Sequence, residues 1–188
     1  GRAQQQATPL TKPLLNQLIS NCDNSVRGLR NQVLLRLGYE TMRRRSELCA
    51  FKFEDICQAP NGKPAIRLNF SKTDQLGFGK VLPISQELCD VLNKWQSFLR
   101  DEGFILRSIS RHGNIGSKLN PASISTTLKA LQKELASGSH EQPLSGHSFR
   151  VGAALDLLEQ GESLEKIMLK GGWQSDSTAI KYLRNWII

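Results

Sequence analysis

The residues best suited to chemistry lie in the last quarter of this 188-residue chain. His147 and Arg150 stand three positions apart at the start of a helix-like run, and a Gly-Gly-Trp corner that ends at Trp173 follows. Tyr182, one of only two tyrosines, comes nine residues after Trp173. Imidazole, guanidinium and indole N–H groups donate hydrogen bonds to phosphate oxygens, and a phenol attacks as its phenolate. This set suits the gripping of a phosphodiester while a phenolate attacks its phosphorus.

Cleavage of a phosphodiester requires stabilisation of the charge on its non-bridging oxygens, by divalent metals or by arginines. A metal site needs clustered carboxylates, but the aspartates of this chain are scattered. Guanidinium groups give paired hydrogen bonds to phosphate oxygens. Arg150 is one such candidate, and the three arginines at residues 43–45 supply another. We therefore expect chemistry that uses no metal and no cofactor.

The composition points to a polyanionic partner. Lys and Arg number 25 against 17 Asp and Glu, which gives a net charge of +8 and a pI near 9.6. Such an excess favours nucleic acid. No apolar run is long enough to cross a bilayer, and the four cysteines form no CxxC pair. We expect a cytoplasmic protein that does not enter membranes.

The elements that must position these residues are expected to be mainly helices. Apolar residues at helical spacing predict helices that begin near Pro13, after Ser85 and after Asn120-Pro121. A further helix is expected to carry Leu29 and Val33 and to end near Gly38. Alternating residues 66–70 and the segment 81–84 predict two strands, with residues 71–80 as a hairpin connection. Residues 104–118 are interpreted as a short strand with a basic, glycine-containing loop. The predicted fold class is α+β, mostly α-helical, with one small antiparallel sheet.

Four motifs in order along the chain resemble the catalytic domain of the tyrosine recombinases, also called the phage integrase family. These are R-x-S-E-L at residues 44–48, S-K-T at 71–73, G-H-S-x-R-V-G-A-A at 146–154 and G-G-W-x8-Y at 171–182. Each motif alone is weak, but four at compatible spacing form a specific pattern. The resemblance covers the chain from about Thr8 to its end.

The resemblance implies a role for each matching position. Arg44 is the first catalytic arginine and Glu47 is the supporting acidic residue three positions later. His147 and Arg150 match the H-x-x-R pair, and Trp173 stands where many members have histidine. Lys72, on the hairpin, is the proton donor to the departing 5′ oxygen, and Tyr182 is the nucleophile. The implied reaction is strand exchange of double-stranded DNA through a 3′-phosphotyrosyl linkage, without metal or cofactor.

Simpler interpretations stay open for several of these residues. Trp173 after two glycines is also typical of a packing anchor, and both roles can coexist. Arg43 and Arg45 have no assigned role, because an arginine run usually forms a solvated face. Glu47 would buttress either His147 or an arginine. Lys72 competes with Lys80, which closes the same hairpin.

The resemblance also implies limits to what this piece does. Many family members carry an N-terminal helical domain and a helix after the nucleophile, whereas this sequence stops six residues after Tyr182. We expect residues 1–7 to be a linker or remnant and residues 8–188 to be the catalytic domain. The full-length protein is expected to form a homotetramer on DNA, and this fragment alone to be a monomer. Alternative functions are a telomere resolvase, a type IB topoisomerase-like nicking-closing enzyme, or a catalytically silent DNA-binding module.

Overall fold

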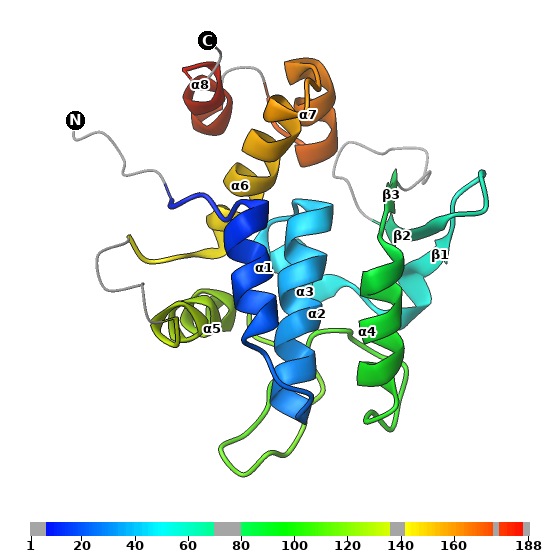
Figure 1. Ribbon diagram of the computed structural model, residues 1–188. Coiled ribbons are helices and arrows are strands. Elements are labelled where there is room, and N and C mark those ends of the chain that lie inside the picture. Colours follow the sequence, from blue (N-terminus) through cyan, green and yellow to red (C-terminus); the bar gives the residue numbers. More distant parts are fainter. Residues whose placement is uncertain (1–6, 70–79, 136–141, 175–176, 186–188) are drawn as a thin grey trace.

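A computed structural model describes residues 7–69, 80–135, 142–174 and 177–185. Helices dominate these segments, and one small sheet follows the third helix (Figure 1). This arrangement confirms the predicted fold class. In chain order the elements are α1 (Lys12–Ser20), α2 (Val26–Thr41), α3 (Arg45–Ala50), the 3-10 helix η1 (Phe53–Asp55), β1 (Ile56–Gln58), β2 (Pro64–Leu68), β3 (Lys80–Pro83), α4 (Gln86–Gln96), α5 (Ala122–Lys133), α6 (Gly146–Glu159), α7 (Leu164–Gly171) and α8 (Thr178–Arg184).

Helix α2 is the central element of the fold. Ser25 caps its N-terminus by accepting a hydrogen bond from the backbone N–H of Gly28, as N-cap serines commonly do. The helix packs against α1, α4 and α6, so apolar and polar residues are buried around most of its circumference. The side that carries Gln32, Arg36 and Glu40 is only partly buried. It runs to Thr41, beyond the predicted end near Gly38, because the chain leaves the helix only at Met42. Met42 has left-handed backbone angles, φ 55° and ψ 33°.

The sheet has three antiparallel strands in the order β1-β2-β3. The two predicted strands are present as β2 and β3, with Ile66 opposite Leu82. Strand β1, in which Ile56 pairs with Ile66, was not predicted from the sequence. This strand has only three residues, too few for an alternating pattern to be visible.

The segment between α4 and α5 forms a small hairpin rather than a regular strand. The N–H of Ser108 donates to the Lys118 carbonyl, and the Ser108 carbonyl accepts the N–H of Gly116. Between these bonds, Ile109 pairs with Ile115. Before it, the fully buried Trp95 of α4 donates its indole N–H to the carbonyl of Ile105 at 2.8 Å. The predicted helix after Ser85 is present as α4. Its buried residues are Leu88, Val91, Leu92 and Trp95, which lie on one face.

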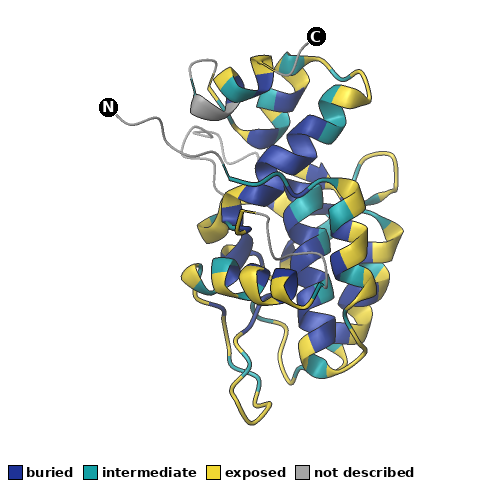
Figure 2. Cartoon of the chain, turned by 60° about the vertical axis from the view of Figure 1, so that its left-hand side comes forward, coloured by how far each residue is buried: buried dark blue, intermediate teal, exposed yellow. Residues whose placement is uncertain are grey.

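The buried apolar residues form two hydrophobic clusters, which adjoin along α6. The larger one fills the space around α2, α4, α5 and the sheet. The smaller one, here called the second cluster, joins Met42 to apolar residues of α6, α7 and α8. Buried residues gather along the helices in the interior, and exposed residues lie on the outer faces (Figure 2). Helix α6 contributes to both clusters, so it connects the two parts of the fold.

A close backbone contact fixes the start of the chain on α6. The N–H of Leu10 donates to the carbonyl of Ser148 at 2.9 Å. A Cβ atom at Gly152 would lie 2.0 Å from the carbonyl oxygen of Leu10. Only glycine therefore allows the segment before α1 to pass this closely over α6.

No helix in the described segments is long and apolar enough to span a membrane. All four cysteines fall within the described residues, and each is a free thiol.

Candidate active site

The first turn of α6 carries the His147–Arg150 pair. Ser145 precedes the helix in an extended conformation, and its N–H donates to the Ser148 hydroxyl at 2.9 Å. The helix then begins at Gly146, so His147 and Arg150 lie one turn apart on the same face. His147 is exposed, whereas Arg150 is buried.

Arg44 is placed by the sharp turn between α2 and α3. Met42 ends α2 in a left-handed conformation, and Arg44 then occupies the N-cap position of α3. Glu47 accepts the backbone N–H of Arg44 at 3.1 Å, and its carboxylate lies 3.9 Å from the Arg44 guanidinium. The Arg44 side chain is 56% exposed, so the backbone is held while the guanidinium faces solvent.

Arg44, His147 and Arg150 meet in one pocket of about 240 Å³. This pocket, here called the arginine pocket, lies between the start of α3, the start of α5 and the first turn of α6. Three guanidinium groups and an imidazole line it, without a carboxylate among the described lining residues. The lining residues are Arg44, Arg45, Ser46, Pro121, Gly146, His147 and Arg150. Such a lining suits a phosphate group, which accepts several charged hydrogen bonds at once.

Arg150 is held by backbone carbonyls and by a tryptophan. Its Nε donates to the Met42 carbonyl at 3.1 Å, and its Nη2 donates to the Gly171 carbonyl at 2.5 Å. Its guanidinium carbon lies 4.6 Å from the centre of the Trp173 ring, within cation–π range. Burial, with Arg44 and Arg43 as further causes, lowers the pKa of Arg150 to about 10. Arg150 therefore stays protonated at neutral pH.

The Gly-Gly-Trp corner seats the Trp173 ring. Gly172 ends α7 with a positive φ of 69°, which favours glycine. A Cβ at Gly171 would lie 2.6 Å from the Trp173 ring, so the ring packs directly on that glycine. Trp173 also packs against the second cluster. The residue is both a packing anchor and a partner of Arg150.

His147 is held in its neutral form. Partial burial lowers the pKa of His147, although the residue as a whole is exposed, and the charges of Arg150, Arg45 and Arg44 lower it further. The arginines therefore carry the positive charge of the pocket at neutral pH, and the imidazole can accept a proton.

Tyr182 lies on α8, which Ser177 caps through the N–H of Ile180. The tyrosine is half-buried and packs against the second cluster, as Trp173 does. It is not among the described residues that line the arginine pocket. The structure therefore brings Arg44, His147, Arg150 and Trp173 together and places Tyr182 on the neighbouring helix.

The remaining candidates are the lysines at the two ends of the predicted hairpin and the arginines that flank Arg44. Lys72 lies outside the described residues. Lys80, at the start of β3, donates to the Leu169 carbonyl at 2.6 Å. Arg43 is only 3% exposed, so the expectation of a solvated face is wrong for this residue, because carbonyls of Thr41 and Lys170 accept its hydrogen bonds. Arg45 is exposed, as expected.

Glu47 contacts arginines, the second of the two partners considered for it. Its carboxylate lies 3.9 Å from both Arg43 and Arg44. Arg43 had no predicted role, although its i,i+4 spacing from Glu47 in the sequence indicates this ion pair.

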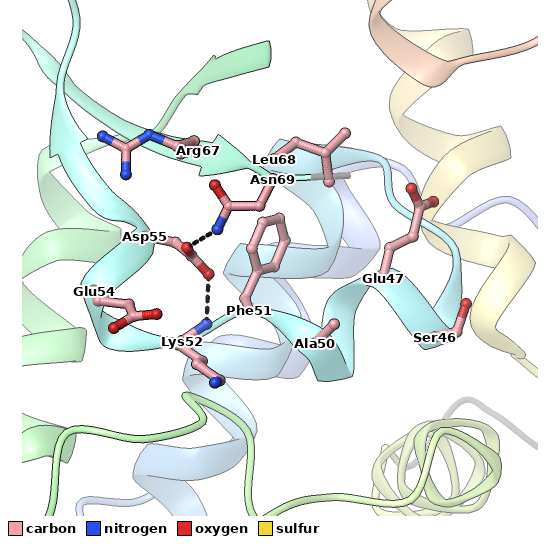
Figure 3. A pocket seen from close by; sticks show the side chains of 10 residues that line it. All are labelled: Ser46, Glu47, Ala50, Phe51, Lys52, Glu54, Asp55, Arg67, Leu68 and Asn69. Atoms are coloured by element: carbon pink, nitrogen blue, oxygen red, sulfur yellow. Dashed lines mark hydrogen bonds between the residues drawn. The ribbon is translucent and has the colours of Figure 1, made fainter. Parts of the chain in front are cut away.

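A second pocket of about 340 Å³ also borders α3. Figure 3 shows that Glu47, Glu54 and Asp55 are among its lining side chains. Asp55 accepts hydrogen bonds from the Asn69 side chain and from the Lys52 N–H, and so ties the end of β2 to η1. The carboxylates make this pocket a poor phosphate site. Within the described segments, no three His, Cys, Asp or Glu residues group as a metal site would require.

The sequence matches a known protein family and is similar to recombinases. The model of the phage integrase family matches residues 9–186. The chain is 26% identical to the recombinase Cre of Escherichia phage P1 over 200 residues, 98% of this chain and 58% of Cre. It is 29% identical to an integrase/recombinase XerD homologue of Selenomonas ruminantium over 192 residues, 97% of this chain and 55% of that protein. The chain thus spans a little over half the length of these curated relatives.

Solved structures share the fold. A XerH site-specific recombinase bound to a palindromic difH substrate has a TM-score of 0.71 at 17% identity, over 96% of this chain and 50% of that one. A lambda integrase tetramer bound to a Holliday junction has a TM-score of 0.66 at 20% identity, over 96% of this chain and 49% of that one. Since the family match runs through almost the whole sequence and the fold agrees with it, the chain belongs to the phage integrase family, the tyrosine recombinases.

Proposed function

We propose that this chain is the catalytic domain, residues 8–188, of a site-specific DNA recombinase. It cleaves and rejoins DNA strands through a 3′-phosphotyrosyl intermediate on Tyr182. The observation that carries the proposal is the convergence of Arg44, His147 and Arg150 in a pocket lined by cations. The family match supplies the reaction class.

The proposed cleavage step is a transesterification. The phenol oxygen of Tyr182 forms a bond to the phosphorus, and the bond from phosphorus to the 5′ oxygen breaks. Neutral His147 takes the phenol proton, and Lys72 gives a proton to the departing 5′ oxygen. Rejoining is the reverse, with a 5′ hydroxyl attacking the phosphotyrosine. Because one ester replaces another, no nucleotide cofactor is required.

The guanidinium groups stabilise the transition state in this proposal. Arg44 and Arg150 hydrogen-bond the non-bridging oxygens, where charge develops during the attack. Trp173 donates its indole N–H to the phosphate and cannot transfer a proton. Glu47 keeps the Arg44 backbone in place through the contact at 3.1 Å.

Double-stranded DNA is the proposed partner, and the cytoplasm is the proposed location. The net charge of +8 favours a polyanion, and two of the structural neighbours were solved with difH substrate or with a Holliday junction. The lambda integrase neighbour is a tetramer. We propose a homotetramer on DNA for the full-length protein and a monomer for the 188-residue chain by itself.

The test is covalent trapping on a pool of DNA duplexes that each contain one nick, with randomised sequence on both sides of it. Cleavage beside the nick releases a short strand, so the covalent complex cannot be resealed and accumulates. We expect SDS-resistant adducts that are enriched in a subset of sequences. Adducts without sequence enrichment would indicate a nicking-closing enzyme. Absence of adducts, with DNA binding retained, would indicate a silent binding module.

A further inference from the structure

The C-terminus of α7 receives cations from three distant parts of the fold. A helix leaves its last four carbonyls without partners inside the helix. Here Met168 accepts the N–H groups of Gly172 and Trp173. The next three carbonyls accept side chains: Leu169 from Lys80 at 2.6 Å, Lys170 from Arg43, and Gly171 from Arg150 at 2.5 Å. All four carbonyls are therefore satisfied, three of them by positive charges that also suit the negative end of the helix dipole.

Each of these three cations comes from an element that carries part of the proposed site. Arg43 directly precedes Arg44 and lies in the turn between α2 and α3. Arg150 is itself in the arginine pocket. Lys80 begins β3 and closes the connection that contains Lys72. The end of α7 is thus the one place, among the described contacts, where the three parts are bonded to a common element.

We propose that Arg43 is a positioning residue, which fixes the end of α7 and thereby the Arg150–Trp173 pair. This inference rests on the proposed function and names a residue that acts through others. The Arg43 guanidinium bonds the carbonyls of Thr41 and Lys170, on the two sides of the junction. Its Nη1 lies 3.9 Å from Glu47 and would be 3.8 Å from a Cβ at Gly172. Arg43 therefore touches the corner that holds Trp173.

Burial removes the Arg43 guanidinium from water, which destabilises the charged group. Its contacts with the Thr41 and Lys170 carbonyls and with Glu47 offset that desolvation. Its guanidinium is 3% exposed, and burial lowers its pKa, with Glu47 opposing that effect and Arg44 adding to it. A methionine at this position would fill a similar volume but leave the Lys170 carbonyl without a donor. The end of α7 would then shift, and with it Gly171, whose carbonyl holds Arg150 and whose Cα supports the Trp173 ring.

The experiment compares Arg43→Met with Arg30→Met. Arg30 is the matched control because its side chain is also buried, at 5% exposed. It bonds Asn31 and the Arg107 carbonyl and makes no hydrogen bond to α7 among the described residues. The first measurement is the indole ¹H–¹⁵N spectrum of the labelled chain. The Trp173 cross-peak is assigned by its loss in Trp173→Phe. Trp95, whose indole bonds the Ile105 carbonyl, serves as the internal reference.

We expect Arg43→Met to move the Trp173 cross-peak by more than a linewidth and to leave the Trp95 cross-peak in place. Arg30→Met should leave the Trp173 cross-peak in place. The second measurement is single-turnover cleavage of the nicked duplexes. Arg43→Met should slow it roughly 10- to 100-fold, as a displacement of about 1 Å in a site can do, with DNA affinity nearly unchanged. Arg43→Lys, which still reaches one carbonyl, should recover part of the rate.

The proposal is overturned if Arg43→Met leaves the Trp173 cross-peak unmoved, or if Arg30→Met slows cleavage as much. Should Arg43→Met fail to fold, Arg43→Lys decides instead, because it keeps the charge but cannot hold the Thr41 and Lys170 carbonyls together. Arg43→Lys should move the Trp173 cross-peak, by less than is expected of methionine, and an unmoved cross-peak contradicts the proposal. If the unmodified chain forms no DNA adduct, the proposed function fails, while the indole spectrum still decides whether Arg43 positions Trp173.

Discussion

Two nitrogens of the Arg150 guanidinium bond protein carbonyls, while the residue also lines the arginine pocket. Nε and Nη2 bond the carbonyls of Met42 and Gly171, and within the described residues Nη1 has no hydrogen-bond partner. A planar fork can hold two carbonyls and still present one nitrogen to a phosphate, which a lysine ammonium on a flexible stem does less well. The geometry explains why an arginine, rather than any cation, suits this position.

The proposed role of Lys72 as proton donor can be tested with a substrate that differs in one atom. Lys72→Ala should slow cleavage by roughly 100- to 10,000-fold, the usual contribution of general acid catalysis. A substrate with sulfur at the bridging 5′ position should restore most of that rate, because a thiolate leaves without a proton. Lys80→Ala should not be rescued, since the Lys80 ammonium bonds the Leu169 carbonyl. Arg150→Ala, which removes charge stabilisation, provides the second comparison.

Rescue of Lys80→Ala but not of Lys72→Ala by the sulfur substrate would place the donor at β3. Rescue of neither would move the role to another residue, with His147 as the next candidate.

The protonation of His147 gives a pH prediction. Burial and three arginines hold its pKa below the ordinary value of 6.5. The folded state therefore binds this proton more weakly than the unfolded state. The contribution of His147 to stability is present above about pH 6.5 and is lost as the pH falls through the lower folded-state pKa. An NMR titration of the His147 ring should show a midpoint below 6.5.

Filling the arginine pocket should raise that midpoint. Inorganic sulfate bound beside Arg44 and Arg150 would offset their charge and favour the imidazolium. The titration is repeated in sulfate and in chloride at equal ionic strength. A midpoint that is the same in both salts would argue against an anion site next to His147.

At the level of elements, the turn from α2 to α3 combines strain with burial. Met42 is fully buried yet has a φ of 55°, a conformation that costs a non-glycine residue about 1 kcal/mol. The turn directs the Met42 carbonyl toward Arg150. A strained backbone position thus helps to hold a side chain that lines the arginine pocket.

This strain predicts an unusual order of stabilities. Met42→Ala and Met42→Gly should both destabilise the fold by about 2–5 kcal/mol, since each leaves a cavity. Because glycine adopts this φ freely, Met42→Gly should be the more stable of the two by about 1 kcal/mol. Leu35 is fully buried within helix α2. There Leu35→Ala should instead be more stable than Leu35→Gly by about 1 kcal/mol in the free energy of unfolding. Urea denaturation measures both pairs, and the same order at both positions would contradict the strain.

The elements also differ in how far the sequence could predict them. Helix α4 was predictable because Ser85 is its cap and its apolar residues follow one face. Strand β1 was not, because its three residues form a strand only by pairing with β2. The burial of Arg43 was invisible locally, since its partner carbonyl at Lys170 is 127 residues away. The motifs located Arg44, His147 and Arg150, whereas their shared pocket depends on how α3 and α6 pack.

At the level of the whole molecule, the charge and the metal-free proposal can be tested together. DNA binding should weaken steeply with added salt, because each neutralised phosphate releases counterions. Cleavage should continue in excess EDTA, since guanidinium groups take the place of metal ions in the proposed transition state. Cleavage that stops in EDTA and returns with magnesium would contradict this prediction.

Tyr182 is proposed to become covalently bound to DNA, and the trapped adduct shows whether it does. The adduct trapped on nicked duplexes is digested with nuclease and protease, and tandem mass spectrometry locates the nucleotide on the chain. The chain has only two tyrosines, Tyr39 and Tyr182, so the outcomes are distinct. We predict a 3′-phosphonucleotide on Tyr182 and no adduct from Tyr182→Phe with unchanged DNA binding. A nucleotide on Tyr39 or another residue, or an adduct that survives in Tyr182→Phe, would contradict the assignment.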